Sequence, residues 1–217
     1  MPLTQAVLFD LDGTLADTAR DLGTALNRLL IEEGRPPQPY DAIRPIASHG
    51  VKALINLGFS VANDHPYAET LRLRFLEHYN HCMIDATCLF TGIAPLIECL
   101  AQRGLLWGIV TNKPARFTQQ LVPALAFSIP PAIVVSGDTV GVAKPDPRPM
   151  WYAAEQIGIP PAHCMYVGDA KRDIDAGRAA GMRTVLANWG YIGHTDHPDE
   201  WGADYRITHP IELLPLL

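Results

Sequence analysis

Two aspartates, Asp10 and Asp12, follow a short apolar run in the segment AVLFDLDGTLADT. Side chains two residues apart on an extended chain point the same way, so both carboxyls can face one pocket beyond the strand end. Like charges this close repel each other unless a positive charge lies beside them or one carboxyl keeps its proton. An isolated Asp-x-Asp pattern is often no more than two solvated loop acids, so its companions decide its meaning.

Four further polar residues follow later apolar runs: Thr111 in IVTNKP, Lys144 in VAKPDP, and Asp169 and Asp173 in YVGDAKRD. Taken singly, Thr111 is compatible with a helix cap, Lys144 with a surface lysine and Asp173 with a charge at a helix N-terminus. The carboxyl ends of parallel strands open on one edge of a sheet, so these residues can converge there. Their joint occurrence in strand order favours one shared site.

The chemistry that needs this set is phosphoryl transfer through a covalent aspartyl phosphate. We expect Asp10 to attack phosphorus, while Asp12 protonates the leaving alkoxide and then activates the hydrolytic water. Lys144 would supply positive charge, and Thr111 would donate a hydrogen bond to the transferring oxygens.

A metal ion would relieve the repulsion between the acids. Hard oxygen ligands from Asp10, the backbone carbonyl of Asp12 and Asp169 suit Mg²⁺, and Asp173 is a further candidate, either as a direct ligand or through water. The sequence therefore predicts Mg²⁺ as the cofactor, with its charge placed against the phosphoryl oxygens.

The elements that must position these residues alternate between strands and helices. Apolar runs without polar alternation, typical of parallel strands buried on both faces, occupy Ala6–Asp10, Leu105–Thr111, Ala132–Val135, Met165–Asp169, Thr184–Ala187 and Tyr205–Ile207. Helices closed by a glycine are expected over Ile93–Arg103, Pro147–Ile157 and Asp173–Ala180. The pattern predicts an α/β fold with a doubly wound, Rossmann-like parallel sheet.

Residues 16–87 break this rhythm and contain no convincing strand. Leucines at helical spacing run until Gly34, and Pro66 opens a second long helix. We predict a helical cap domain over 16–87, inserted into a catalytic core formed by 1–15 and 88–217. Its segment IRPIASHGVKAL is predicted to be a polar loop that faces the phosphate. Candidates there for binding substrate, each equally compatible with an ordinary exposed position, are Arg44, Ser48, His49 and Lys52.

Composition narrows the partners. The chain has 217 residues and is 48% hydrophobic, which is enough for a packed core. Its 17 basic against 23 acidic residues, a net charge of −6, argue against a nucleic-acid partner and leave a small phosphorylated metabolite. The first residues lack a secretion-signal pattern, no apolar run is long enough for a membrane, and four cysteines form no Cys-x-x-Cys pair. We expect reduced thiols and a cytoplasmic location, while the oligomeric state is not readable.

With these motifs in place, the chain resembles the haloacid dehalogenase superfamily of phosphatases over essentially its whole length. The motifs are DLDGT, the threonine of VTNKP, the lysine of AKPDP, and GDAKRD. The resemblance implies that the insertion is a type-one cap, and we add Asn112 as a substrate-binding candidate. Because the dehalogenases lack the second aspartate of the first motif, Asp12 argues against dehalogenation.

Within the superfamily the chain is similar to the phosphoglycolate phosphatase group. The segments TNKPARF and GYIGHTDHPDEWGAD more closely resemble the N-acetylmuramic acid 6-phosphate phosphatases, which serve cell-wall sugar recycling. The aromatic residues Trp189, Tyr191 and Trp201 are at least as compatible with packing as with ligand contact. The resemblance favours N-acetylmuramic acid 6-phosphate as the substrate, with 2-phosphoglycolate as the alternative.

Three other functions use similar groups. A phosphomutase needs only a cap that excludes water, and a non-catalytic phosphate-binding protein would keep the pocket without turnover. A phospho-accepting receiver domain also gathers acids, a threonine and a lysine around Mg²⁺. The receiver is disfavoured because the candidate nucleophile, Asp10, follows the first strand and because a signalling switch needs no large helical insertion.

Overall fold

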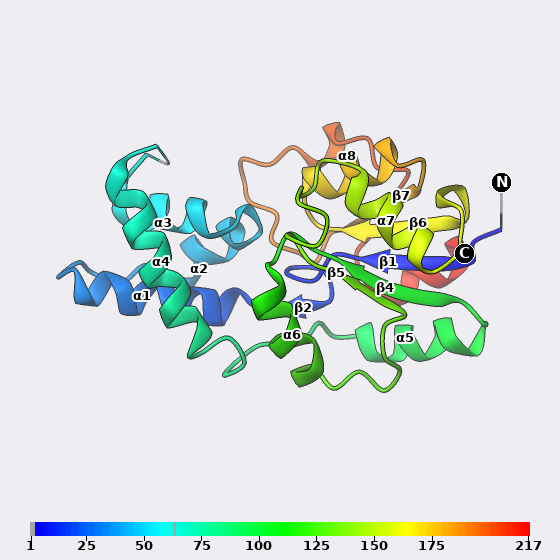
Figure 1. The fold of residues 1–217 in the computed structure, drawn as a ribbon, viewed down its shortest axis with the longest axis horizontal. Helices are drawn as coiled ribbons and strands as arrows, with labels where there is room; N and C mark the ends of the chain where they lie inside the picture. The colour runs from blue at the N-terminus through cyan, green and yellow to red at the C-terminus, as the bar shows by residue number, and fades with distance from the viewer. Residues whose placement is uncertain (1–2, 63) are drawn as a thin grey trace. The chain divides into compact units, whose positions relative to one another are not determined.

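The computed structural model describes residues 3–62 and 64–217 and divides the chain into two compact units. One unit is Met1–Ala16 with Leu89–Leu217, and the other is Asp17–Cys88. Figure 1 shows the elements of both, and each is described here by itself.

The first unit is built on a six-stranded parallel sheet of order β5-β4-β1-β6-β7-β8. The strands are β1 (Ala6–Phe9), β4 (Leu106–Val110), β5 (Ile133–Val135), β6 (Cys164–Gly168), β7 (Arg183–Ala187) and β8 (Tyr205–Ile207). All six predicted strands are confirmed, and so is the doubly wound α/β fold. Strands β1, β4 and β6 end at Phe9, Val110 and Gly168. The polar residues predicted to end these strands, Asp10, Thr111 and Asp169, are therefore the first residues of the loops that follow.

Helices cover both faces of this sheet (Figure 1). They are α5 (Ile93–Gln102), α6 (Ala115–Ala124), α7 (Arg148–Gln156) and α8 (Lys171–Ala179). Successive side chains of β1 enter opposite layers: Val7 and Phe9 pack in a cluster with α5 and α6, and Ala6 and Leu8 pack in a cluster with α7 and α8. This two-sided burial is the reason the strand reads as a continuous apolar run.

Helix α8 begins two residues earlier than predicted. The carboxylate of Asp173 accepts a hydrogen bond from the backbone N–H of Ala170 at 3.0 Å, so Asp173 is the third residue of the helix and caps its start. The other end follows the prediction, since Gly181 has a φ of +79° just beyond the helix. Three-residue 3₁₀ turns η2 (Pro161–His163) and η3 (Pro198–Glu200) and the longer η4 (Pro210–Leu216) complete the unit.

The second unit is helical, with α1 (Ala19–Glu32), α2 (Tyr40–Ile43), η1 (Arg44–His49), α3 (Val51–Phe59) and α4 (Pro66–Asn80). The two long helices predicted from the leucine spacing and Pro66 are confirmed, and α1 packs on α3 and α4. At the start of the insertion, β2 (Ala16–Asp17) pairs with β3 (Cys88–Leu89), a strand that the sequence analysis did not expect. Two residues are too few for a periodic signal.

The predicted polar loop over IRPIASHGVKAL is wrong. Ile43 ends α2, and the following residues form η1 and the start of α3, joined at Gly50, whose φ of +83° lies in the region that favours glycine. Pro45 at the first turn of η1 is compatible with a helix because its missing N–H is not needed there. The polar residues therefore lie on short helices.

A buried aspartate closes the helical unit. The side chain of Asp21, 1% exposed on α1, accepts hydrogen bonds from the backbone N–H groups of Ala86 and Thr87 and from the Thr87 hydroxyl, at 2.7 to 3.1 Å.

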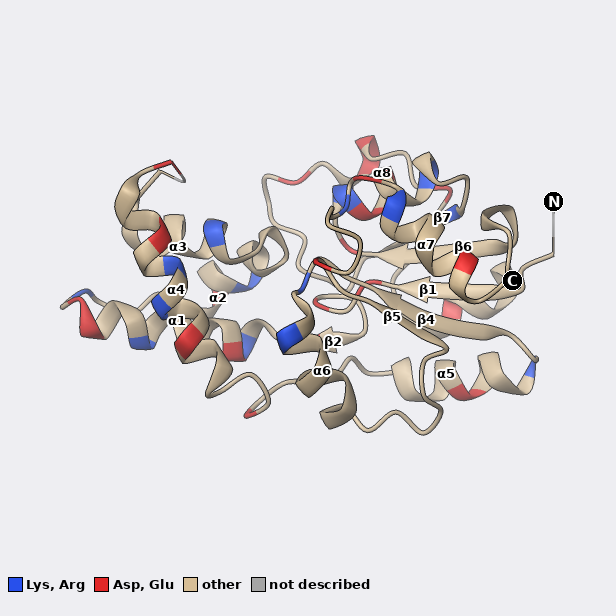
Figure 2. Cartoon of the chain, viewed as in Figure 1, with Lys and Arg blue, Asp and Glu red and all other residues tan. Residues whose placement is uncertain are grey.

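On the surface of the helical unit, charges of both signs are mixed along α1 and α4 (Figure 2), where Arg74 pairs with Glu32 and Glu33.

Among the described residues, no helix combines the length and apolarity needed to cross a lipid bilayer. The four cysteines are all free thiols. Burial raises the pKa of Cys82 and of Cys164 to about 11, so both thiols are protonated at neutral pH and pack as small apolar groups.

Candidate active site

Three buried aspartates meet at the carboxyl edge of the sheet. Asp10 follows β1, Asp169 follows β6 and Asp173 lies in the first turn of α8; one oxygen from each lies within 4.8 Å of the others. They are 0 to 1% exposed. We call these three residues the acid cluster. The parallel topology brings them together from positions that are far apart in the sequence.

Lys144 supplies the positive charge that the acid cluster requires. Its Nζ lies 2.9 Å from Oδ1 of Asp10 and 2.7 Å from Oδ1 of Asp173, in a fully buried ion-pair network. It also contacts the carbonyl oxygen of Val110 at 2.9 Å and the hydroxyl of Tyr166 at 2.7 Å. Four partners fix this ammonium group between two of the acids.

The two acids that share Lys144 have opposite pKa shifts. Burial opposes ionisation of Asp10, but the charges of Lys144 and Arg172 outweigh it and hold the pKa of that carboxyl below its usual range. Burial, together with repulsion from Asp10, raises the pKa of Asp173, and Lys144 offsets this only in part. The surroundings therefore favour the ionised form of Asp10 more strongly than that of Asp173.

Asp169 is fixed by the loop after β7. Its Oδ2 accepts a hydrogen bond from the backbone N–H of Tyr191 at 2.9 Å, and its Oδ1 accepts one from the Thr14 hydroxyl at 3.2 Å. Two glycines leave room for it: a Cβ atom on Gly13 would lie 2.3 Å from Oδ2, and one on Gly190 would lie 2.2 Å from the Cβ of Asp169. Any larger residue at either position would displace the carboxylate.

Asp12 is not a member of the acid cluster. Its Oδ1 pairs with Nζ of Lys113 at 2.8 Å, and both side chains are mostly buried. Lys113 follows Thr111 and Asn112 in the loop after β4. The loop after β4 thus places a cation directly against Asp12.

Thr111 and Asn112 lie in the same loop. Thr111 is 3% exposed, and its Oγ1 accepts a hydrogen bond from the backbone N–H of Lys113 at 3.2 Å. The Asn112 carboxamide binds both the N–H and the C=O of Lys144, each at 2.9 Å. Asn112 therefore positions the backbone of Lys144, while its predicted contact with substrate stays a prediction.

The aromatic residues of the C-terminal segment pack within the core unit. The indole N–H of Trp189 donates to the carbonyl oxygen of Thr14 at 3.0 Å, and the ring of Tyr191 lies against Phe90. Trp201 joins a buried cluster with Ile174 and Leu186. These contacts favour the packing interpretation and show how the segment supports the turn after Asp10.

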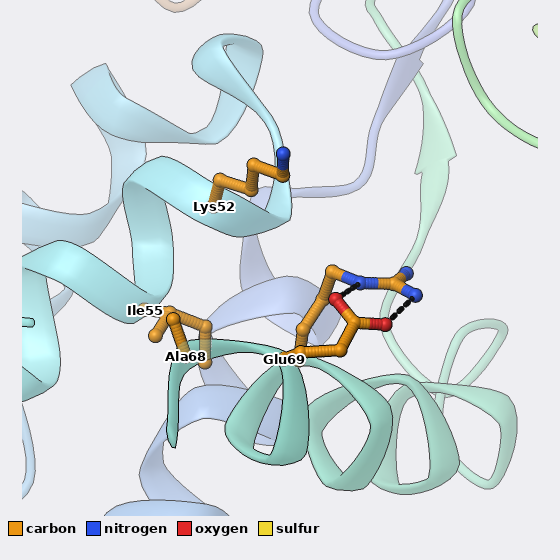
Figure 3. Close-up of a pocket in the computed structure, with 5 residues that line it drawn as sticks. Lys52, Ile55, Ala68 and Glu69 are labelled. Atoms are coloured by element: carbon orange, nitrogen blue, oxygen red, sulfur yellow. Dashed lines mark hydrogen bonds and ion pairs between the residues drawn. The ribbon is translucent and has the colours of Figure 1, made fainter. Parts of the chain in front are cut away.

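The candidates in the helical unit differ in exposure. Arg44 is half-buried, Ser48 is buried, and His49 and Lys52 are exposed. Lys52 lines a small pocket between α3 and α4, together with Ile55, Ala68, Glu69 and Arg72 (Figure 3). On the α4 side of this pocket, Arg72 and Glu69 form a bidentate pair at 2.6 and 2.8 Å. The role of these residues in substrate binding stays a prediction.

The sequence analysis missed three residues of the site. Lys113 and Arg172 are charged residues inside motifs that it had identified, so their position in those motifs was an available signal. Tyr166 was harder to identify, because an aromatic residue within a buried apolar run is expected to belong to the core. Burial raises the pKa of Tyr166 well above its usual range, so its hydroxyl stays protonated and donates to Val110.

The chain is similar to known hydrolases over nearly its whole length. The family model for haloacid dehalogenase-like hydrolases matches residues 7–187. An N-acetylmuramic acid 6-phosphate phosphatase from Pseudomonas aeruginosa is 39% identical over 98% of this chain and 94% of its own length. A phosphoglycolate phosphatase from Xanthomonas campestris is 40% identical over 98% of this chain and 96% of its own. The crystal structure of a predicted phosphoglycolate phosphatase from Haemophilus somnus aligns with a TM-score of 0.87 at 22% identity, covering 100% of this chain and 99% of that one, and shares the fold.

The chain belongs to the haloacid dehalogenase-like hydrolases. It is an enzyme of the phosphatase type, as the resemblance in its motifs predicted.

Proposed function

We propose that this phosphatase is a Mg²⁺-dependent phosphomonoesterase that acts on a small phosphorylated sugar acid through an aspartyl phosphate at Asp10. The observation that carries the proposal is the state of Asp10: it is buried, it is ionised, and Lys144 holds it at the edge of the sheet. An ionised, oriented carboxylate with an adjacent cation is what nucleophilic attack on a phosphate monoester needs.

The reaction divides into two displacements at phosphorus. In the first, a carboxylate oxygen of Asp10 forms a bond to phosphorus, the bond to the substrate oxygen breaks, and protonated Asp12 delivers its proton to the leaving alkoxide. In the second, Asp12, now a carboxylate, takes a proton from water as the water oxygen attacks phosphorus. Asp10 leaves as a carboxylate and inorganic phosphate is released. Lys113, with its Nζ 2.8 Å from Oδ1 of Asp12, holds the Asp12 side chain in place through both steps.

The donor set of the acid cluster fits a hard cation, because three buried carboxylates offer oxygen ligands only. Asp10, Asp169 and the carbonyl of Asp12 would hold Mg²⁺, which supplies positive charge against the phosphoryl oxygens when bound. Asp173 already pairs with Lys144 through Oδ1 and accepts a hydrogen bond from the N–H of Ala170 through Oδ2. We therefore propose that Asp173 keeps both partners and is not a direct ligand of the ion.

For the substrate we favour N-acetylmuramic acid 6-phosphate, which would place the enzyme in peptidoglycan recycling. Two Pseudomonas relatives at 39 and 40% identity carry that name over nearly the whole chain. Relatives of equal similarity are named phosphoglycolate phosphatases, so 2-phosphoglycolate is the second candidate. We propose that the helical unit acts as the cap. Within it, the residues proposed to bind the sugar acid are Arg44, Ser48, His49 and Lys52.

The test is phosphate release from both compounds by the full chain, with Mg²⁺ and with EDTA. We expect a higher kcat/KM for N-acetylmuramic acid 6-phosphate, no turnover in EDTA, and a loss of more than about 1,000-fold in Asp10→Asn. Turnover that survives chelation or Asp10→Asn contradicts the mechanism. A preference for 2-phosphoglycolate contradicts only the substrate, and an absolute need for a bisphosphate activator would indicate a phosphomutase.

A further inference from the structure

Arg172, the second residue of α8, is a second cation at the candidate nucleophile. Its side chain is 22% exposed, and its Nη2 lies 3.7 Å from Oδ2 of Asp10. This distance is too long for a hydrogen bond, so the contact is one of charge alone. The Nε of Arg172 is buried and has no hydrogen-bond partner among residues 3–62 and 64–217.

Lys144 and Arg172 differ in how their donors are used. The ammonium group of Lys144 has four partners within 2.9 Å. The guanidinium of Arg172 lies 3.7 Å from the Asp10 carboxylate, and its buried Nε donates to nothing in the described part of the chain. Leaving such a donor unpaired costs free energy, so a partner that arrives from outside would relieve that cost.

The two oxygens of Asp10 also favour a phosphoryl group as the partner of Arg172. Oδ1 accepts a hydrogen bond from the N–H of Leu11 at 2.8 Å and forms an ion pair with Lys144 at 2.9 Å, while Oδ2 is the oxygen nearest to Arg172. A phosphoryl group that approaches Asp10 brings its non-bridging oxygens next to this carboxylate, and so within reach of the guanidinium. The planar fork of arginine matches two oxygens of one phosphate better than a lysine does.

We propose that Arg172 binds the phosphoryl group of the substrate through its non-bridging oxygens. This inference rests on the proposed function, because it places the phosphoryl group at Asp10. During transfer the guanidinium would stabilise the charge that spreads over the three equatorial oxygens. The alternative is that Arg172 only balances the charge of the acid cluster.

The two roles differ in what a substitution changes. A phosphate-binding residue sets the affinity for phosphate and leaves the affinity for Mg²⁺ nearly as it was. A charge-balancing residue repels the metal ion, so its removal raises the affinity for Mg²⁺ and leaves phosphate affinity unchanged.

The variants are Arg172→Gln, Arg172→Lys, and Lys171→Gln as a matched control. Lys171 is the neighbouring cation on α8; it is exposed and pairs with Asp175 at 2.6 Å, so its removal changes the net charge by the same amount outside the site. The probe is inorganic phosphate titrated calorimetrically into each folded protein in saturating Mg²⁺, alongside kcat and KM and the Mg²⁺ concentration for half-maximal activity.

We expect Arg172→Gln to weaken phosphate binding by about 10- to 100-fold, with a raised KM and a lowered kcat, while half-maximal Mg²⁺ changes by less than about twofold. Arg172→Lys should fall between Arg172→Gln and wild type, and it carries the test if Arg172→Gln does not fold. Phosphate affinity within about twofold of wild type in the folded variants overturns the inference, whatever the effect on Mg²⁺. Wild-type enzyme that releases no phosphate from either compound contradicts the proposed function instead, while the phosphate titration still decides on Arg172.

Discussion

The acid cluster at the carboxyl edge of the sheet and the two exposed substrate-binding candidates of the helical insertion lie in opposite environments. At the sheet edge, Asp10, Asp169 and Asp173 are buried, and each is fixed by a backbone N–H, a hydroxyl or Lys144. In the insertion, His49 and Lys52 are exposed on short helices. Buried charges must be paired in one arrangement, whereas exposed ones need not be. The sheet edge is therefore built for one fixed chemistry, and the insertion offers positions that can change without unfolding the protein.

The largest effect is expected from removal of Lys144, the cation that lies between Asp10 and Asp173. Lys144→Met should lower kcat by about 100-fold or more and destabilise the fold by about 3–5 kcal/mol, because two buried carboxylates lose their shared partner. Urea unfolding and phosphate release measure the two effects. Lys171→Met, an exposed change on α8, should show neither; a Lys144→Met protein with near wild-type activity would refute the assigned role of Lys144.

A smaller change should displace one acid without removing a charge. In Gly190→Ala the new Cβ would meet Asp169, so we expect the Mg²⁺ concentration for half-maximal activity to rise by about 10- to 100-fold. Gly181→Ala is the matched control: its Cβ meets no atom within 4 Å, although a φ of +79° strains the backbone. It should cost about 1 kcal/mol of stability and leave the Mg²⁺ requirement unchanged. Equal Mg²⁺ requirements in both variants would contradict the proposed place of Asp169.

In the insertion, the expected effect is on specificity. Lys52→Gln should leave the free energy of unfolding within about 0.5 kcal/mol of wild type, because the side chain is exposed. We expect kcat/KM for the sugar phosphate to fall by less than about tenfold, with unchanged affinity for inorganic phosphate. Lower affinity for inorganic phosphate would show instead that the insertion shapes the phosphate site itself.

The smallest expected effect is on the pH dependence of folding, measured by urea unfolding in EDTA. The lowered pKa of Asp10 contributes stability above its unfolded value of 3.8, which is lost as the pH falls through the folded pKa. The raised pKa of Asp173 acts in reverse: its contribution is complete below 3.8 and is lost as the pH rises through the folded pKa. From acid to neutral pH, the stability gap between wild type and Asp10→Asn should widen, while the gap to Asp173→Asn should narrow. Gaps that move in the same direction would contradict the opposite shifts.

Much of the sheet edge could be predicted because its signals are local. A buried parallel strand is a continuous apolar run, and its end is marked by the first polar residue, as at Asp10, Thr111 and Asp169. Topology then brings these ends together, so spacing along the chain does not matter.

What sequence could not give are contacts that depend on side-chain direction. Nothing in NKP shows that Lys113 turns toward Asp12, or that Asn112 binds the backbone of Lys144. The segment from Arg44 to Lys52 was predicted as a loop because polar residues surround a glycine. In the structure the glycine joins two helices. The sequence pattern does not distinguish polar residues on a short exposed helix from polar residues in a loop when no long apolar stripe is present.

The central claim is that Asp10 becomes phosphorylated during turnover. The direct measurement is to quench the enzyme with acid in the presence of Mg²⁺ and the better substrate, reduce it with borohydride, and locate the product by peptide mass spectrometry. Borohydride converts an aspartyl phosphate to homoserine, so we predict homoserine at position 10 in wild type and none in Lys171→Gln quenched without substrate. An active enzyme that shows no homoserine under any quench time, or shows it at another aspartate, would contradict the account.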